Sequence, residues 1–253
     1  MDPWATSSLS PELACGWLHD EDLFERTYPM DLRPQGQDII RTWLFSTVVR
    51  ANLEFGALPW QHAGISGWIL DPDHKKMSKS KGNVVTPMGL LEKYGSDAVR
   101  YWAASARLGL DATFDEAQMK IGRRLAIKVL NASKFALTMG GENTALDLDP
   151  ARISLELDRS VIAELRRVIS VASDALAAYD HSRALEVTEA FFWTFCDDYL
   201  ELVKERAYNR DGKWAEDEAV SARTVLAIVI DTVIRLLAPF LPYVTEEVWS
   251  WYR

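Results

Sequence analysis

Cysteine, histidine and long apolar runs are scarce in this chain of 253 residues. The two cysteines, Cys15 and Cys196, are too far apart for a clustered metal site, and we interpret both as reduced structural residues of a cytoplasmic protein. The apolar stretch at residues 224–237 does not reach the length of a membrane span and is interrupted by Asp231 and Arg235. These absences exclude a disulfide framework and predict neither a metal site nor a membrane helix.

The composition is that of an ordinary globular protein. Hydrophobic residues make up 48% of the chain and charged residues 26%, which is enough for one large domain or two modest ones, each with a core. The formal net charge of −9 argues against a protein that coats nucleic acid without preference. It does not exclude a nucleic-acid partner, because the local distribution of charge matters more than the total.

The most informative segment is the lysine loop, which we define as residues 75–83 (KKMSKSKGN). It places four lysines within seven residues, and apart from Met77 nothing in it gains from burial. Four neighbouring ammonium groups repel one another, which favours an anionic ligand. A polyphosphate suits lysine, a mobile charge with three N–H donors. A solvated basic loop without a ligand is the alternative interpretation.

The flanking sequence favours a ligand-binding loop in an α/β fold. The apolar run at residues 62–70 is typical of a buried strand, and residues 71–73 (DPD) are typical of a turn. A helix entered after Pro87 is expected at residues 88–94. Open α/β sheets bind their ligands at the carboxyl ends of strands, which is where this loop would lie.

The first part of the chain, residues 1–113, alternates strand-like and helix-like segments. This order predicts a partial Rossmann-like α/β fold, half of a doubly wound parallel sheet. A short strand is expected near residues 28–32 and a helix at residues 39–53, for which Asp38 can serve as the N-cap.

The second part of the chain is helical. Residues 114–150 contain a connecting helix (116–139) and a linker, and residues 151–253 carry long periodic apolar patterns that predict an all-α helical bundle. The expected bundle helices cover residues 155–179, 182–208 and 216–237. Most of the bundle's aromatic residues are expected in the core, including Phe191, Trp193, Phe195 and Phe240.

A basic face is expected on the connecting helix. Residues 118–135 contain five basic residues and no acidic one, and Lys120, Arg124 and Lys128 recur at a spacing of four, so they share one face. Contact with nucleic-acid phosphates and a solvated helix face both remain open as interpretations.

Several of these segments resemble one family. Residues 76–80 (KMSKS) match the second signature of the class I aminoacyl-tRNA synthetases, and residues 81–87 and 94–100 resemble the valine, isoleucine and leucine subgroup. Residues 2–11 and 30–40 look most like the valyl enzymes. Residues 191–201 and 237–249 resemble the anticodon-binding domain of the family. The resemblance covers nearly the whole chain.

The resemblance implies valine–tRNA ligase chemistry. ATP, accompanied by Mg²⁺, activates valine to valyl-adenylate, and the valyl group is then transferred to tRNA(Val). The residues that the resemblance assigns to catalysis are Lys76 and Lys79, which would hold the β- and γ-phosphates. To ATP binding it further assigns Gly36, Asp38, Gly67, Trp68, Met77, Ser78 and Ser80. To the amino-acid pocket it assigns Asp2, Trp4 and Ile39. The tRNA contacts would be Lys120, Arg124 and Lys128.

The sequence also departs from the family pattern. Pro3 stands where the valyl enzymes carry threonine, and no two of the four histidines lie close enough to form the first class I signature, His-x-Gly-His. We therefore expect an internal to C-terminal part of a valyl enzyme, inactive without a partner that supplies the N-terminal half. A tRNA-binding paralogue without catalysis and a part of an isoleucyl or leucyl enzyme are the alternatives.

Overall fold

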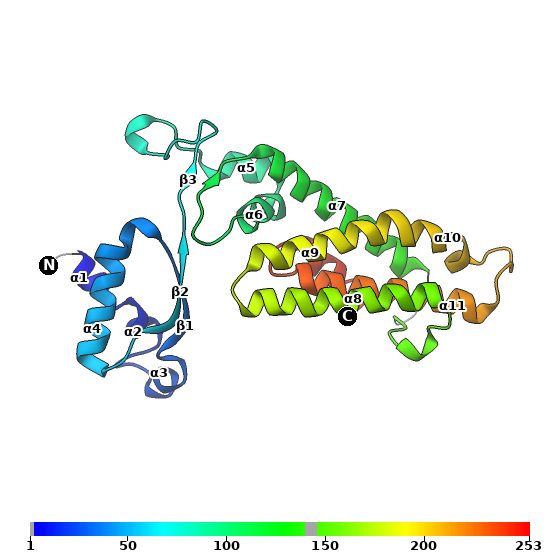
Figure 1. Ribbon diagram of the computed structural model, residues 1–253, viewed down its shortest axis with the longest axis horizontal. Coiled ribbons are helices and arrows are strands. Elements are labelled where there is room, and N and C mark those ends of the chain that lie inside the picture. Colours follow the sequence, from blue (N-terminus) through cyan, green and yellow to red (C-terminus); the bar gives the residue numbers. More distant parts are fainter. Residues whose placement is uncertain (1–2, 140–145) are drawn as a thin grey trace. The chain divides into compact units, whose positions relative to one another are not determined.

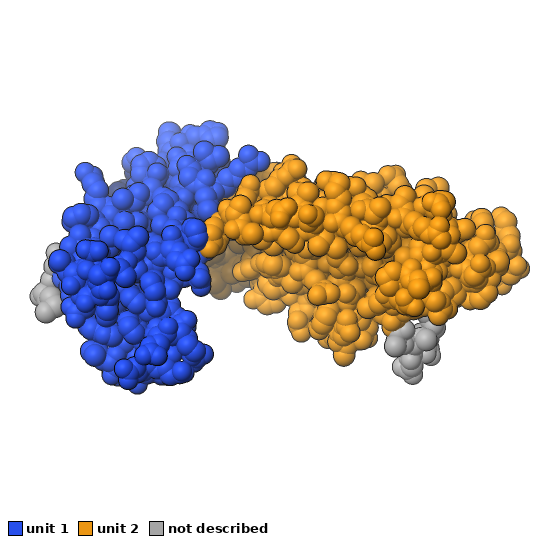
Figure 2. Space-filling model, turned by 60° about the horizontal axis from the view of Figure 1, so that its bottom comes forward, with its two compact units in different colours: residues 1–84, 107–114 blue, residues 85–106, 115–253 orange. Residues whose placement is uncertain are grey.

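A computed structural model describes residues 3–139 and 146–253, apart from the side chain of Lys79. The chain forms two compact units, shown in different colours in Figure 2. The first unit comprises Met1–Val84 and Arg107–Phe114, and the second comprises Val85–Ala106 and Asp115–Arg253. The prediction for Asp2 therefore falls outside the described residues.

The first unit is built around two short parallel sheets. Strand β1 (Met30–Gly36) pairs with β2 (Trp60–Ser66), so that Met30 lies opposite Trp60 and Gly36 opposite Ser66. Strand β3 (Ile69–Leu70) pairs in parallel with β4 (Ala112–Thr113). Figure 1 shows β1 and β2 side by side, with α4 (Phe45–Phe55) connecting them along the chain. The expected half of a parallel α/β sheet is confirmed.

Short helices complete the first unit. Three of them precede β1, two lead from β1 into α4, and one lies within the lysine loop. In chain order these are α1 (Pro3–Ser7), α2 (Ser10–Ala14), α3 (Glu21–Thr27), η1 (Gln37–Ile39), η2 (Ile40–Leu44) and η3 (Lys79–Lys81). The helix expected at residues 39–53 is present, but it begins with a 3₁₀ turn (η1) and a π turn (η2) before becoming regular.

The strand expected to end at residue 70 is interrupted at Gly67 and Trp68. The chain segment before β4 crosses there: Gly109 N–H donates to the Ile65 carbonyl (2.8 Å), and Ala112 N–H donates to the Trp68 carbonyl (2.9 Å). A Cβ added at Gly67 would lie 2.6 Å from Asp111 N, which is far inside van der Waals contact. The crossing segment therefore requires both the break in the strand and the glycine.

The second unit is helical throughout its described residues, apart from turns and connecting segments. Its elements are α5 (Pro87–Tyr94), α6 (Ser96–Ala104), α7 (Glu116–Thr138), η4 (Pro150–Arg152), α8 (Glu156–Ala177), α9 (His181–Thr194), η5 (Phe195–Tyr199), α10 (Leu200–Tyr208), α11 (Glu216–Leu237) and α12 (Pro242–Trp249). The helices expected at residues 116–139, 155–179 and 216–237 are confirmed to within two residues at each end. The expected bundle is therefore present.

The helix expected at residues 182–208 contains a π turn. Element η5 joins α9 to α10 without leaving helical geometry. Along this stretch Phe191 stacks on Phe195 and Phe195 on Tyr199, with ring centroids 6.4 and 5.7 Å apart. Phe191, Phe195 and Phe240 are buried as expected. Trp193 is half-buried, and its indole N–H donates to Glu189 Oε1 (3.1 Å).

Two charged side chains attach α6 to the start of α12 and to the turn before it. The Asp97 carboxylate accepts from the backbone N–H of Tyr243 (3.2 Å) and of Val244 (2.8 Å), which lie in the first turn of α12. Arg100 donates to the carbonyl of Pro239 (2.8 Å). Asp97 thereby satisfies two backbone donors that an α-helix leaves unpaired at its N-terminus.

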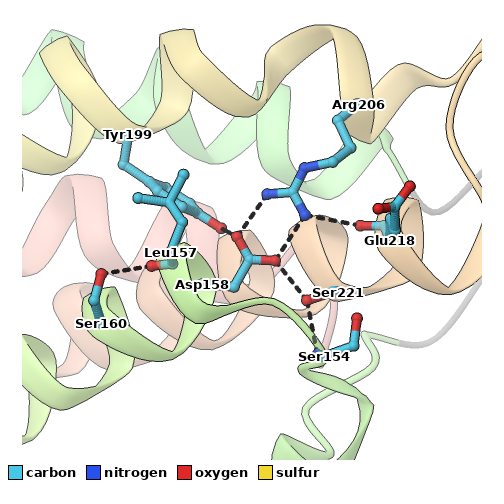
Figure 3. A network of polar contacts seen from close by, with 8 residues as sticks. All are labelled: Ser154, Leu157, Asp158, Ser160, Tyr199, Arg206, Glu218 and Ser221. Atoms are coloured by element: carbon cyan, nitrogen blue, oxygen red, sulfur yellow. Dashed lines mark hydrogen bonds and ion pairs between the residues drawn. The ribbon is translucent and has the colours of Figure 1, made fainter.

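A buried carboxylate, Asp158, connects four helical segments of the bundle (Figure 3). Arg206 donates to both of its oxygens, at 2.6 and 2.8 Å, and the Tyr199 hydroxyl donates to Oδ1 at 2.8 Å. The Ser221 hydroxyl donates to Oδ2 and accepts from Ser154 N–H. Burial by itself would raise the pKa of Asp158, but the hydrogen bonds from Arg206, Ser221 and Tyr199 outweigh it and lower the pKa.

Replacing Arg206 with methionine should destabilise the bundle by about 3–5 kcal/mol, because Asp158 would stay buried without its cation. Asp158 has a lowered pKa in the folded state, so the stability gained from its pairing is present above the unfolded pKa of about 4 and is lost as the pH falls through the folded pKa. The difference between wild type and variant should therefore shrink below about pH 4. Urea denaturation followed by circular dichroism, at neutral and acid pH, measures both effects.

The matched control is Arg159→Met. Arg159 pairs with Glu156 three residues away at 2.8 Å, but both side chains are largely exposed, so its loss should change stability by less than about 1 kcal/mol. Equal costs for the two variants would contradict the role assigned to the Asp158 network.

Candidate functional site

The carboxyl edge of the β1–β2 pair brings two predicted ligand-binding stretches together. Gly36 ends β1 and lies opposite Ser66, the last residue of β2, so Gly67 and Trp68 follow immediately on the neighbouring strand. The Ser66 hydroxyl donates to the Gln35 carbonyl (3.2 Å) and ties the two strand ends together. Four residues assigned from sequence, Gly36, Asp38, Gly67 and Trp68, therefore belong to one edge of one sheet.

Asp38 does not cap a helix. Gly36 is the N-cap of η1 and makes no side-chain capping bond, and the N-terminal caps of η2 and α4 lack one as well. The capping interpretation of Asp38 is therefore wrong. Its exposed carboxylate makes no hydrogen bond with any residue that the structure describes, and a Cβ at Gly36 would come within 2.9 Å of its Oδ1. Glycine at position 36 leaves room for this carboxylate.

Trp68 is fixed by hydrogen bonds at both its backbone N–H and its backbone carbonyl. Its N–H donates to Asp111 Oδ1 (2.8 Å) and its carbonyl accepts from Ala112. The indole ring lies beneath Lys76, whose ammonium group is 4.0 Å from the ring centroid. This cation–π contact places one of the two predicted catalytic lysines beside the sheet edge.

The lysine loop leaves β3 and is held at its base by Asp71. Asp71 Oδ1 accepts from the N–H groups of Lys75 (2.8 Å) and Asp73 (3.0 Å), and Oδ2 accepts from Asn83 Nδ2 (2.7 Å). The hydrogen bond from Asn83, followed by that from Lys75, lowers the pKa of Asp71. Sequence patterns predicted Asp71 only as a turn residue and missed its contact with Asn83, because the two partners stand twelve residues apart.

The interior of the loop is polar and largely exposed. Asn83 Oδ1 accepts from Ser78 N–H (2.9 Å), and the hydroxyls of Ser78 and Ser80 are 3.2 Å apart. Lys76, Ser80 and Lys81 are exposed, whereas Met77 and Ser78 are half-buried. The position of the Lys79 ammonium group lies outside what the structure describes.

The predicted amino-acid pocket is brought together only in part. Trp4 lies in α1 and lines a cavity of about 730 Å³ with η2 and α4, whose apolar lining includes Phe45 and Val49. Ile39 is half-buried in η1 and is not among the residues that line this cavity.

Two side chains fix α1 beside this cavity. The Trp43 indole donates to the Ser7 carbonyl (2.9 Å), and Arg50 Nε donates to the Ser8 hydroxyl (2.8 Å). Trp43 is itself packed between Arg33 and Trp60, with the Arg33 guanidinium 4.0 Å from its ring centroid and the Trp60 ring 5.6 Å away. Trp43 therefore links Ser7 of α1 to residues of β1 and β2.

The basic residues of α7 differ in their surroundings. Lys120 and Arg124 are exposed, whereas Lys128 is half-buried and donates to Asp197 Oδ1 (3.0 Å). This hydrogen bond raises the pKa of Lys128. Of the three predicted tRNA contacts, Lys128 therefore already has its charge paired with a carboxylate of the bundle, that of Asp197.

Two further kinds of feature are absent from the residues that the structure describes. No group of three or more histidine, cysteine, aspartate or glutamate side chains there could hold a metal ion. In the same residues, no helix combines the length and apolar character needed to cross a membrane.

Replacing Gly67 with alanine should cost about 2 kcal/mol or more, because the new Cβ would meet the backbone of Leu110 and Asp111, which β3–β4 pairing keeps in place. Gly64→Ala in the same strand is the matched control, since its Cβ would be 3.7 Å from Leu32 Cδ1, an ordinary contact. Urea denaturation and deuterium exchange of residues 60–70 report the effect. A Gly64 variant as damaged as the Gly67 variant would refute this packing argument.

Comparison with known proteins gives consistent matches. Residues 1–115 match the family model of class I tRNA synthetases (I, L, M and V), and residues 158–252 match that of the anticodon-binding domain of tRNA ligases. The chain is 66% identical over 253 residues to a valine–tRNA ligase of Thermobifida fusca, covering all of this chain and 28% of that protein. It is 60% identical to one of Salinispora tropica, covering all of this chain and 29% of that protein. The chain thus spans less than a third of the curated relatives it matches.

Solved structures agree on the fold. A leucyl-tRNA synthetase of Agrobacterium radiobacter K84, in a ternary complex with tRNA, superposes with a TM-score of 0.79 at 21% identity over 99% of this chain and 31% of that one. A methionyl-tRNA synthetase of Mycobacterium tuberculosis, in complex with methionyl-adenylate, gives 0.77 at 24% identity over 97% of this chain and 49% of that one.

Proposed function

Because this chain belongs to the class I tRNA synthetases, we propose that it is an internal to C-terminal part of a valine–tRNA ligase. It would comprise the second half of the catalytic domain and the anticodon-binding domain. The observation that carries the proposal is the lysine loop at the end of β3 in a chain 66% identical to a valine–tRNA ligase. The same identity favours valine over leucine or isoleucine as the amino acid.

The proposed reaction has two steps. An oxygen of the valine carboxylate attacks the α-phosphorus of ATP, the bond from that phosphorus to the bridging oxygen breaks, and pyrophosphate leaves. A ribose hydroxyl of tRNA(Val) then attacks the carbonyl carbon of valyl-adenylate, and AMP leaves. The first step needs positioning and neutralisation of charge on the departing pyrophosphate more than it needs an acid or a base. Lys76 and Lys79 would supply that charge, with Met77, Ser78 and Ser80 completing the loop.

The sheet edge would hold the nucleoside part of ATP. The Asp38 carboxylate, which has no hydrogen-bond partner among the described residues, can accept from ribose hydroxyls. Gly36 would let the backbone approach the ribose, and Gly67 with Trp68 would flank the adenine. Lys76 would leave the Trp68 ring for the phosphates, because a triphosphate attracts an ammonium group more strongly than an aromatic face does.

The valine pocket would be formed by Asp2, Trp4 and Ile39, with the part of the enzyme that precedes this chain in its longer relatives. Phe45 and Leu53 on the cavity side of α4 are 62% and 82% exposed, which supports a further partner surface there. This N-terminal half is the proposed partner for activity.

Mg²⁺ is proposed to arrive with ATP. The described residues hold no cluster of metal ligands, and Mg²⁺ commonly binds through substrate phosphates while keeping several waters. Since the proposed reaction serves translation, its proposed place is the cytoplasm.

The proposed function is tested by changing Lys79 to alanine in the full-length protein. Valine-dependent exchange of pyrophosphate into ATP should fall about 10²-fold, the cost of losing one preorganised cationic donor, or roughly 3 kcal/mol. The wild-type chain of 253 residues on its own should show no exchange, and adding the N-terminal half as a separate chain should restore it.

Lys213→Ala, in the turn between α10 and α11, serves as the control and should leave exchange unchanged. Near-normal exchange by the Lys79 variant would remove the lysine loop from catalysis. Exchange that depends on leucine or isoleucine in the wild type, rather than on valine, would reject the proposed substrate.

Contact between α7 and tRNA is the second proposal on function. Lys120→Ala and Arg124→Ala should each weaken tRNA(Val) binding and lower the steepness of its salt dependence by about one unit on a double-logarithmic plot. Lys128→Ala should have a smaller effect, because Lys128 already pairs with Asp197. Filter binding over a range of salt concentrations measures all three, and a larger effect at Lys128 than at the other two would contradict the assignment.

A further inference from the structure

We propose that Asp71 and Asn83 form a clasp that keeps the lysine loop in the shape required for adenylate formation, with Asn83 as the positioning residue. The proposal rests on the proposed function of this loop. It concerns two residues that touch neither phosphate nor valine in the scheme above and would act through the loop backbone.

Asn83, the last residue of the loop, bonds both the middle of the loop and Asp71, which precedes the loop. Its Oδ1 accepts from Ser78 N–H (2.9 Å), within the KMSKS stretch, and its Nδ2 donates to Asp71 Oδ2 (2.7 Å). The same Nδ2 lies 3.4 Å from the Lys76 carbonyl. One amide side chain thereby fixes the backbone at the two residues on either side of Met77.

Asp71 supplies the fixed end of the clasp. It is only 8% exposed, and both of its carboxylate oxygens are used, Oδ1 by Lys75 and Asp73 N–H and Oδ2 by Asn83. Its N–H also donates to the Lys75 carbonyl (2.9 Å). Hydrogen bonds to an ionised, shielded carboxylate are stronger than those between neutral groups.

Among the described residues the loop has a few further restraints: Lys76 forms a β-bridge with Leu70 and lies over the Trp68 ring, and Lys81 N–H donates to the Ser78 carbonyl (3.1 Å). Lys75, Lys76 and Lys81 are exposed, so no core packing restrains their backbone, and their charges repel one another. The carboxylate of Asp71 offsets part of this repulsion at the base of the loop. Without the clasp, the loop would sample many shapes, and ATP binding would have to order it at the cost of transition-state stabilisation.

Because Asn83 donates and Asp71 accepts, exchanging these two roles tests the clasp in the full-length protein. Asn83→Asp sets two carboxylates against each other, and Asp71→Asn sets two amide groups against each other. The double variant with both changes restores a donor and an acceptor in reversed order, and its new carboxylate at position 83 could still accept from Ser78 N–H. Each single variant should lower kcat for valine-dependent pyrophosphate exchange about 10- to 100-fold, and the double variant should recover most of it.

Two readouts separate positioning from a general loss of structure. Pyrophosphate has left before the second step, so transfer of valine from preformed valyl-adenylate to tRNA, measured in a single turnover, should change less than about twofold. The KM for valine should stay constant. Deuterium exchange of residues 71–84 should become faster in each single variant and return to the wild-type rate in the double variant.

Asp73→Asn is the matched control, because its exposed side chain contacts only Lys75 among the side chains that the structure describes, at 3.7 Å, and it should leave all these values unchanged. Single variants with normal exchange kinetics, a double variant without recovery, or a transfer step that falls with the exchange step would each overturn the clasp. A wild-type enzyme without pyrophosphate exchange would instead reject the proposed function. In that case the clasp is tested by deuterium exchange alone. An exchange rate of residues 71–84 that is unchanged in both single variants would overturn it.

Discussion

The parallel pairing of β1 with β2 is the constraint on which the candidate site depends. Because Gly36 lies opposite Ser66, both strands end at one edge, and the turns that follow them carry Asp38 on one side and Trp68 on the other. Strand β3 then continues to the lysine loop, and β4 fixes it through the crossing at Gly67. A shift of one residue in the β1–β2 register would move every side chain of one strand to the opposite face.

Some charged side chains of this chain form ion pairs within the structure, whereas others remain available to bind an anionic ligand. Asp158 and Arg206 neutralise each other in the core, and Lys128 is paired with Asp197 on the bundle surface. Lys76, by contrast, contacts an aromatic ring and has no carboxylate partner among the described residues. A cation held by an aromatic face keeps its full charge for an incoming anion, which a salt bridge would have cancelled.

How far the sequence predicted the structure depends on the distance between partners. The helices of the bundle and the lysine loop follow from local patterns, such as the apolar period of residues 216–237 and the charge density of residues 75–81. Contacts across long separations were missed. Asp158 and Arg206 are 48 residues apart in the sequence, and Lys128 and Asp197 are 69 residues apart. A polar residue in a periodic apolar pattern is expected on the solvent face of its helix unless its partner is known. Asp38 was expected to cap a helix because the 3₁₀ start of that helix leaves no trace in the sequence.

The π turn at η5 also sets the rotational phase of everything that follows it. A π turn takes one more residue than an α turn, and one residue corresponds to about 100° around a helix axis. Arg206, seven residues after Tyr199 on α10, therefore owes its direction to this insertion. Removing one residue from Phe195–Tyr199 would leave a continuous, regular helix with good hydrogen bonds, yet it would turn the guanidinium about a quarter of the way around the axis from Asp158. The helical content would be unchanged by such a deletion, but Asp158 would be left buried without its cation and the protein would be destabilised.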